Sequence, residues 1–379
     1  PALAETVTVR DVAGLRAAVA AARPGTRIEL APGEYAGGLA FTGIAGTAAA
    51  PVTITAADPE RPPVIRGGGS GLHLTDAVHV VLSDLVLEGA TGNGLNLDDG
   101  GTPETPAHHV VLRRLRVRDV GPRGNCDGLK LSGVADARVE DCTVERWGTG
   151  GSAVDMVGCH RVTVVGCTFR HTPGMQGASG VQAKGGSAAI VVRGCRFEDA
   201  GARAVNAGGS TGRAYFRPPL SEVDAPFAEA RDVRVVGNTF VGGGAAIAFV
   251  GVDGAVFRWN TVVRPGRWLA RILQETRDEG FTACRRGDVS DNVVVFRSDS
   301  WSEGGINVGD ATDPASFTFR RNVWLCEDDP ARTAALVRPP VREEDPVHAR
   351  GPLLRAADDL RVRDPALARR AGAEACPPE

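Results

Sequence analysis

The feature that most constrains this chain is a short strand-like segment that recurs nine times. The first copy is VLSDLVLEG at 81–89 and the last is FRRNVWLCE at 319–327. Within each copy, apolar residues alternate with other residues, which is the periodicity of a β-strand. Successive copies are 22 to 43 residues apart. One equivalent position is occupied in turn by Leu85, Leu115, Cys142, Cys167, Cys195, Asn238, Asn260, Asn292 and Asn322.

A step of this length holds two or three short strands and their turns, which is one coil of a solenoid. We therefore predict an all-β fold, a single-stranded right-handed parallel β-helix of about nine or ten coils. One domain can span all 379 residues, because each coil packs only on its neighbours. We expect the N-terminal cap and first strands over 1–66, the coils over 67–330, and a C-terminal tail packed on the helix over 331–379.

Particular residues refine this prediction. Val12 to Arg23 has helical spacing of apolar residues and ends at Pro24-Gly25, so it is expected to cap the N-terminal end. At the equivalent position of the repeat, the four asparagines predict a ladder of amide hydrogen bonds. The three cysteines at the same position predict a buried row without disulfides. Cys284, Cys326 and Cys376 lie outside this row. A disulfide between two of them could hold the tail.

A second recurrent strand places polar residues on one face. It reads GLHL at 71–74, GLKL at 128–131 and AVDM at 153–156, with the third residue expected to point outward. We call these third positions the polar column: His73, Asn96, Lys130, Asp155, Gln182, Asn206, Ala248 and Asn307. Amides and short carboxylates bind sugar hydroxyls well, so the column suggests a glycan-binding groove. The alternative is an ordinary polar face containing a Lys130–Asp155 ion pair.

Lysine usage singles out two residues. The chain has 43 Lys and Arg, and only Lys130 and Lys184 are lysine. Both fall on the face of the column, two coils apart. Lysine can become a neutral base when its pKa is depressed, whereas arginine stays protonated.

Two insertions flank the column. The first contains Arg213, Tyr215 and Arg217, and the second, at 264–287, contains Trp268 and Arg271 on an expected short helix. Long loops that carry aromatic and arginine residues beside a polar groove suit the walls of a saccharide cleft.

Charge and hydropathy exclude other functions. The formal charge of −3 and the pI near 6.2 give no basic field for nucleic acid. No apolar stretch approaches the ~20 residues of a membrane span. We expect a monomer that is secreted, periplasmic or on the cell surface, with Pro1 to Ala4 left from a signal-peptide cleavage region.

The N-terminal segment VAGLRAAVAAARPGTRIELAPGEY resembles the cap of secreted β-helix polysaccharide lyases of the alginate lyase and chondroitinase B type. VQAKGGS at 181–187, followed one coil later by a Cys-x-Phe strand, resembles the region around that family's catalytic lysine. The resemblance implies that Lys184 is the catalytic base. It also includes NCDGLKL, which is similar to pectate lyases and would make Lys130 the base.

The chain departs from the family pattern in two places. The family has an arginine one coil after the lysine, where this chain has Gly208, so Arg203, Arg213 or Arg217 would replace it. The family's calcium-binding acids correspond to Gly180 and Gln182. Either no cofactor binds, or calcium uses a different set of oxygen ligands. The candidate ligands are Asp98, Asp99, Asp127 and Asp155.

Our leading hypothesis is a polysaccharide lyase that cleaves a uronate-containing glycan by β-elimination. A uronate C5-epimerase would begin with the same proton abstraction, a glycoside hydrolase would use Asp127 and Asp155, and a glycan-binding protein would have no catalysis. The candidate catalytic residues are Lys184, Lys130, Arg203 and Arg217. The candidate substrate-binding residues are Asn96, Asp127, Asp155, Gln182, Asn206, Arg213, Tyr215, Trp268 and Arg271.

Overall fold

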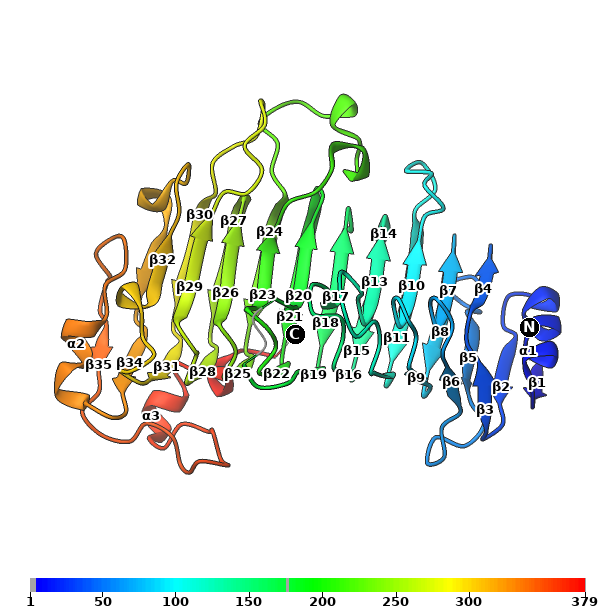
Figure 1. The fold of residues 1–379 in the computed structure, drawn as a ribbon, viewed down its shortest axis with the longest axis horizontal. Helices are drawn as coiled ribbons and strands as arrows, with labels where there is room; N and C mark the ends of the chain where they lie inside the picture. Colours follow the sequence, from blue (N-terminus) through cyan, green and yellow to red (C-terminus); the bar gives the residue numbers. More distant parts are fainter. Residues whose placement is uncertain (1–4, 175–176, 379) are drawn as a thin grey trace.

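The computed structural model describes residues 5–174 and 177–378. Pro1 to Ala4, expected to remain from signal-peptide cleavage, lie outside the described residues. The chain winds into stacked coils whose strands form three parallel sheets, and this confirms the predicted parallel β-helix (Figure 1).

Each coil contributes one strand to each sheet along most of the helix. Sheet 1 contains β1 (Thr6–Val9), β2 (Arg27–Leu30), β5 (Val52–Ala56), β8 (Val78–Ser83), β11 (Ala107–Arg113), β15 (Arg138–Glu140), β18 (Thr163–Val165), β21 (Ser187–Arg193), β24 (Ala230–Val236), β27 (Val252–Arg258), β30 (Arg285–Ser290) and β33 (Thr318–Arg320), with β14 (Val134–Ala135) paired to β11. Sheet 2 contains β4 (Leu39–Thr42), β7 (Leu72–Thr75), β10 (Leu95–Asp98), β13 (Leu129–Ser132), β17 (Ser152–Val157), β20 (Ser179–Lys184), β23 (Arg203–Gly208), β26 (Ala245–Val250), β29 (Trp268–Leu273) and β32 (Ile306–Val308). Sheet 3 contains β3 (Glu34–Ala36), β6 (Val64–Arg66), β9 (Val86–Glu88), β12 (Arg116–Arg118), β16 (Thr143–Glu145), β19 (Thr168–Arg170), β22 (Arg196–Glu198), β25 (Thr239–Val241), β28 (Thr261–Val263), β31 (Val293–Phe296), β34 (Val323–Cys326) and β35 (Val347–His348).

The asparagine ladder forms inside the coils as predicted. The Nδ2 of Asn260 donates to the Oδ1 of Asn292 at 3.1 Å and to the carbonyl of Val235 at 3.0 Å. The same pattern links Asn238 to Asn260 and Asn292 to Asn322, and all four side chains are fully buried. The ladder therefore satisfies its own amides while it fixes the turn between sheets 1 and 3 in four successive coils.

The cysteines are all free thiols. The row Cys142, Cys167 and Cys195 is buried without disulfides, as predicted. The disulfide considered for a pair among Cys284, Cys326 and Cys376 does not form. Cys284 is buried in the core, and Cys326 donates to Asp328, so neither thiol is available to hold the tail.

Different structures cover the two ends of the stack. Helix α1 (Val12–Ala21) is capped by the Asp11 side chain and buries Leu15 and Ala18 against the first coil. At the other end, β35 pairs with β34, and the tail contains two short helices, α2 (Thr333–Leu336) and α3 (Pro365–Ala368). Leu353 and Val362 of the tail pack on the outer face of sheet 3.

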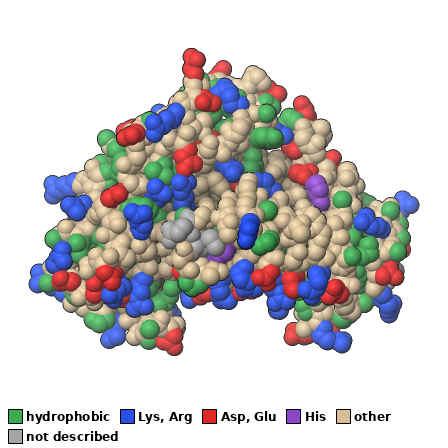
Figure 2. Space-filling model, viewed as in Figure 1, with side chains coloured by type: hydrophobic (Ala, Val, Ile, Leu, Met, Phe, Trp, Pro, Cys, Tyr) green, Lys and Arg blue, Asp and Glu red, His purple; other side chains and the backbone are tan. Residues whose placement is uncertain are grey.

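The long loops leave the coils at one corner, where sheet 2 continues into sheet 1. They span 99–106, 209–229 and 274–284 and extend beyond the ends of the sheet 2 strands, the last two side by side and the first apart from them (Figure 1). We call them the first, second and third corner loops. In the space-filling view, the second and third project above the face that carries sheet 2 (Figure 2). The rings of Phe216 and Phe281 lie 5.5 Å apart, so these two loops brace each other.

One expected element is wrong. Residues 268–273, expected to begin a short helix, form the strand β29 instead, and the rest of that segment is the third corner loop. The alternation of buried side chains along WLARIL meets the register of β26, and this pairing outweighs the helical propensity of Leu, Ala and Arg. Among the helices of the described residues, none has the length and apolar character needed to cross a bilayer.

Candidate functional site

The polar column forms in the register that the sequence indicates. Sheet 2 pairs His73 with Asn96, Asn96 with Lys130 and Lys130 with Asp155. The pairing continues from Asp155 to Gln182 and Asn206. Beyond Ala248 the strand β29 inserts Arg271, which the sequence-based column omitted because that segment was expected to be helical.

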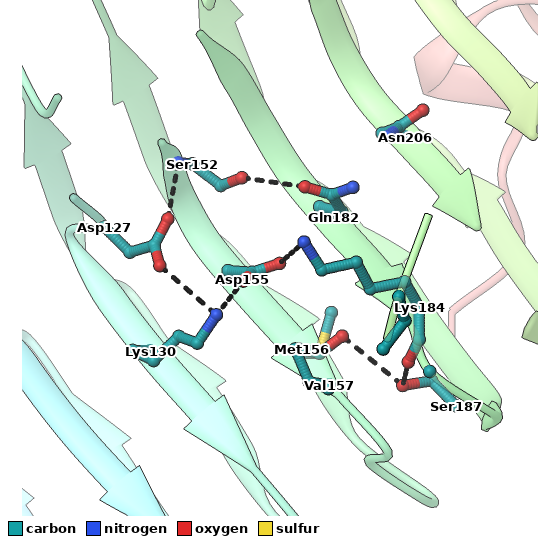
Figure 3. Close-up of polar contacts among 12 residues, drawn as sticks. Asp127, Lys130, Ser152, Asp155, Met156, Val157, Gln182, Lys184, Ser187 and Asn206 are labelled. Atoms are coloured by element: carbon teal, nitrogen blue, oxygen red, sulfur yellow. Dashed lines mark hydrogen bonds and ion pairs between the residues drawn. The ribbon is translucent and has the colours of Figure 1, made fainter. Parts of the chain in front are cut away.

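The centre of the column is a cluster of charged groups on β13, β17 and β20 (Figure 3). The Lys130 ammonium contacts Asp155 and lies 3.5 Å from an oxygen of Asp127. The Lys184 ammonium reaches back across one coil, so that its Nζ lies 3.6 Å from Oδ1 of Asp155. That oxygen is buried and accepts no hydrogen bond among the described residues. The two lysines of the chain therefore flank one buried carboxylate.

Burial gives these groups unusual proton affinities. Burial and the neighbouring Asp155 carboxylate raise the pKa of Asp127 to about 6. Burial lowers the pKa of Lys130, but Asp155 and Asp127 outweigh it and raise that pKa above its ordinary value. Lys130 therefore remains an ammonium ion, and Asp127 is the acid that can exchange a proton near neutral pH.

The column is less exposed than the alternation alone predicted. Asp155 and Asn206 were expected to point outward to solvent, but they are 1% and 2% exposed. Neighbouring polar side chains cover them, and the lysine side chains are only 23% and 16% exposed. The site is thus desolvated enough for its charges to interact strongly.

Hydrogen-bonded amides extend the cluster on both sides. Asn93 bridges two coils, because its Nδ2 donates to Asn96 at 2.7 Å and its Oδ1 accepts from the backbone N–H of Asp127 at 2.7 Å. On the other side, Ser152 donates to Gln182 at 3.2 Å. The network fixes the side chains at the centre of the column.

Each of the three candidate arginines already has a carboxylate partner. Arg203 bonds to Glu275 at 2.7 Å and to Asn206, so it stands beside the column. Arg213 lies 3.7 Å from Asp278. Arg217 turns away to Asp99, at 2.9 Å, and lines a cavity of about 250 Å³ between the first and second corner loops. Of the three, only Arg203 lies on a strand of sheet 2, where it bonds to Asn206 of the polar column.

The aromatic candidates differ in position. Tyr215 is 67% exposed on the second corner loop. Trp268 is buried, and the guanidinium groups of Arg267 and Arg271 lie 4.2 and 4.6 Å from its ring centroid. Trp268 therefore packs beneath two guanidinium groups, and its ring is not exposed for stacking on a sugar. No carboxylate of the described residues lies within ion-pair distance of Arg271, which bonds to Asn307.

The four aspartates considered for calcium do not come together. Asp98 bonds to His73 at 2.5 Å, and Asp99 bonds to Arg217. Asp127 and Asp155 do lie together, but the Lys130 ammonium occupies the position between them. A calcium ion takes six to eight oxygen ligands, more than this pair provides.

Glu229 is a residue that the sequence analysis missed. It is fully buried at the base of the second corner loop. Its carboxylate accepts from the backbone N–H groups of Gly185 and Thr211, at 3.1 and 3.0 Å, and from the hydroxyl of Thr276 at 2.5 Å. Glu229 therefore ties the residue after Lys184 to both large corner loops. A lone glutamate within a loop offers no sequence signal for such a role.

The fold is similar to solved structures of polysaccharide lyases. An alginate lyase from Paenibacillus sp. str. FPU-7 is 20% identical with a TM-score of 0.51, over 82% of this chain and 97% of that one. A mutant of the PL6 family alginate lyase AlyGC is 14% identical with a TM-score of 0.56, and the match covers 97% of this chain but 56% of the lyase. The pectate lyase Pel9A is 15% identical with a TM-score of 0.50, over 80% and 73% of the two chains.

Sequence comparison adds no closer relationship. No family model matches the chain, and no curated protein matches it. At identities of 14 to 20%, the structural similarity concerns the fold alone. The chain is a right-handed parallel β-helix of the kind found in alginate and pectate lyases.

Proposed function

We propose that this protein is a polysaccharide lyase that cleaves a uronate-containing glycan by β-elimination, with Lys184 as the base. The observation that carries the proposal is the pair of lysines around Asp155, at the centre of the polar column. Two carboxylates hold Lys130 in its charged form. Lys184 contacts one carboxylate oxygen at a longer distance and is the only other lysine of the chain.

In this reaction, Lys184 takes the proton from C5 of a uronate. The electron pair forms the C4–C5 double bond, and the bond from C4 to the glycosidic oxygen breaks, so that this oxygen leaves and takes a proton from water. Arg203, on the strand after that of Lys184 and bonded to Asn206 of the column, is the candidate to neutralise the uronate carboxylate and make the C5 proton more acidic. Arg271, three strands beyond Gln182 on the column, suits the carboxylate of a further sugar.

The test is a screen of acidic polysaccharides for products that absorb ultraviolet light through the new double bond. On the active polymer, Lys184→Arg should keep binding but lose about 100-fold or more of turnover, because arginine cannot release its proton. Arg116→Lys, on the exposed face of sheet 3, is the control and should behave as wild type. Full activity in Lys184→Arg would remove this residue from the mechanism.

A glycoside hydrolase is the second candidate, and the raised pKa of Asp127 favours it. A carboxylic acid with a pKa of about 6 beside a second carboxylate fits the acid and nucleophile of a glycosidase. The same screen separates the alternatives. A hydrolase releases reducing ends without absorbance, an epimerase incorporates solvent deuterium at C5 without cleavage, and a binding protein does neither.

A further inference from the structure

Three of the seven histidines of this chain meet on the surface of sheet 1. His79 lies on β8, and His108 and His109 lie on β11 in the next coil. Each offers one nitrogen such that the three atoms lie within 4.8 Å of one another. The Nδ1 atoms of His108 and His109 are 2.7 Å apart, and the rings of His79 and His109 are 4.4 Å apart.

The backbone brings the histidines together but does not require them. Val78 pairs with His108 and Val80 with Val110, so His79 and His109 occupy equivalent positions. Both have a left-handed backbone, with φ near 50°. The same conformation recurs at Asp136 and Arg161, which occupy this position in the next two coils. Aspartate and arginine also adopt this left-handed conformation at the equivalent position, so the backbone conformation alone does not explain why histidines occur here.

The cluster has the chemistry of a transition-metal site. Imidazole nitrogen is the ligand that Zn²⁺, Cu²⁺, Ni²⁺ and Co²⁺ accept readily, and three nitrogens leave a position for water. His79 and His108 are half-buried and His109 is exposed, so solvent can complete the coordination.

A carboxylate, Asp136, lies beside the cluster and is paired with Arg161. Asp136 interacts electrostatically with His108 and His109, and Arg161 holds it through two hydrogen bonds of 2.6 and 2.8 Å. The cluster also stands where β11 follows the first corner loop, so an ion there would fasten that loop's base to the preceding coil.

We propose that His79, His108 and His109 bind one divalent transition-metal ion, with water in the remaining positions. The site lies on sheet 1, apart from the lysines of sheet 2, and does not depend on the glycan chemistry. The structural alternative is a group of neutral imidazoles that share one Nδ1 to Nδ1 hydrogen bond.

Calorimetry on the full chain, free of any histidine tag and treated with a chelator, separates these alternatives. Titration with Zn²⁺ should give one ion per chain with a Kd on the order of micromolar. Replacing zinc by Co²⁺ should give the visible absorption of a low-coordinate nitrogen-bound ion. Absence of saturable Zn²⁺ binding below about 100 µM would overturn the proposal.

Variants assign the binding to these residues. His109→Gln, at an exposed position that folding does not need, should weaken binding at least about tenfold, and His79→Gln with His109→Gln should abolish it. Thermal unfolding without metal checks that each variant folds. His348→Gln, on exposed β35, and Lys184→Arg are controls that should bind as wild type. Equal binding by the double variant would also overturn the assignment.

Discussion

At the scale of single residues, one buried carboxylate organises the candidate site. Asp155 is shared by the two lysines of the chain, and burial together with that same neighbour raises the pKa of Asp127 to about 6. Strand alternation placed Lys130 beside Asp155 correctly. It could not show that the Lys184 side chain reaches back to the preceding coil. The strand register determines the position of each Cα atom, but it does not determine the conformation of a long side chain.

Asp127 should make the protein less stable as the pH rises. Its pKa is raised from 3.8 to about 6, so the folded chain holds this proton more tightly than the unfolded chain. Its contribution to stability is therefore full below pH 4 and lost as the pH rises through about 6. Through this group, the wild-type chain should lose on the order of 3 kcal/mol of unfolding free energy between pH 4 and pH 7. Asp127→Asn should not show this loss, because asparagine does not titrate.

Urea unfolding at both pH values measures this effect. Asp119→Asn is an informative control, since Arg146 lowers the pKa of that exposed aspartate and its stabilisation is lost as the pH falls. Asp119→Asn should change the pH dependence of the unfolding free energy by a small amount, and in the opposite direction to Asp127→Asn. An unchanged pH dependence in Asp127→Asn would contradict the raised pKa.

At the scale of elements, the inward-facing repeat determines the fold. The equivalent position from Leu85 to Asn322 predicted both the coil and the asparagine ladder, because each depends on a local pattern that recurs. The strand β29 could not be predicted in the same way. Its residues have a local preference for helix, and that preference is all that the segment itself shows. The strand forms because it pairs with β26 of the preceding coil.

The ladder should contribute more to stability than the cysteine row. Asn260→Ala removes the partners of the Val235 carbonyl and of both Asn238 donors, all buried, and should lower the free energy of unfolding by about 3 kcal/mol. Cys167→Ala, in the same column of the core, removes a thiol that makes only weak hydrogen bonds and should lower the free energy of unfolding by about 1 kcal/mol. Chemical denaturation measures both values, and similar losses would contradict the ladder's role.

At the scale of the whole molecule, the stack ends because other segments cover its edges. Helix α1 covers the first coil. The tail pairs β35 with β34, adds Glu344 beside Arg320, and places Glu343 against the last asparagine at 2.7 Å. An uncovered parallel edge would present free backbone groups to another molecule.

Removal of 340–379 should therefore make the protein self-associate. The truncation exposes the edge of β34 and the apolar side chains Val323 and Leu325, which the tail now covers. Light scattering should show association that grows with concentration, whereas a shorter truncation that removes 365–379 and keeps β35 should show much less. A monomeric long truncation would contradict this view of the tail.

The placement of the corner loops has a consequence for how such a protein can change. All three leave the solenoid where sheet 2 turns into sheet 1, so their length alters neither the coil's cross-section nor the register of its neighbours. The scaffold and the surface that the corner loops form can therefore vary independently. Grafting a different loop at 209–229, with the buried Glu229 retained, would change the surface beside Lys184 and leave the scaffold unchanged.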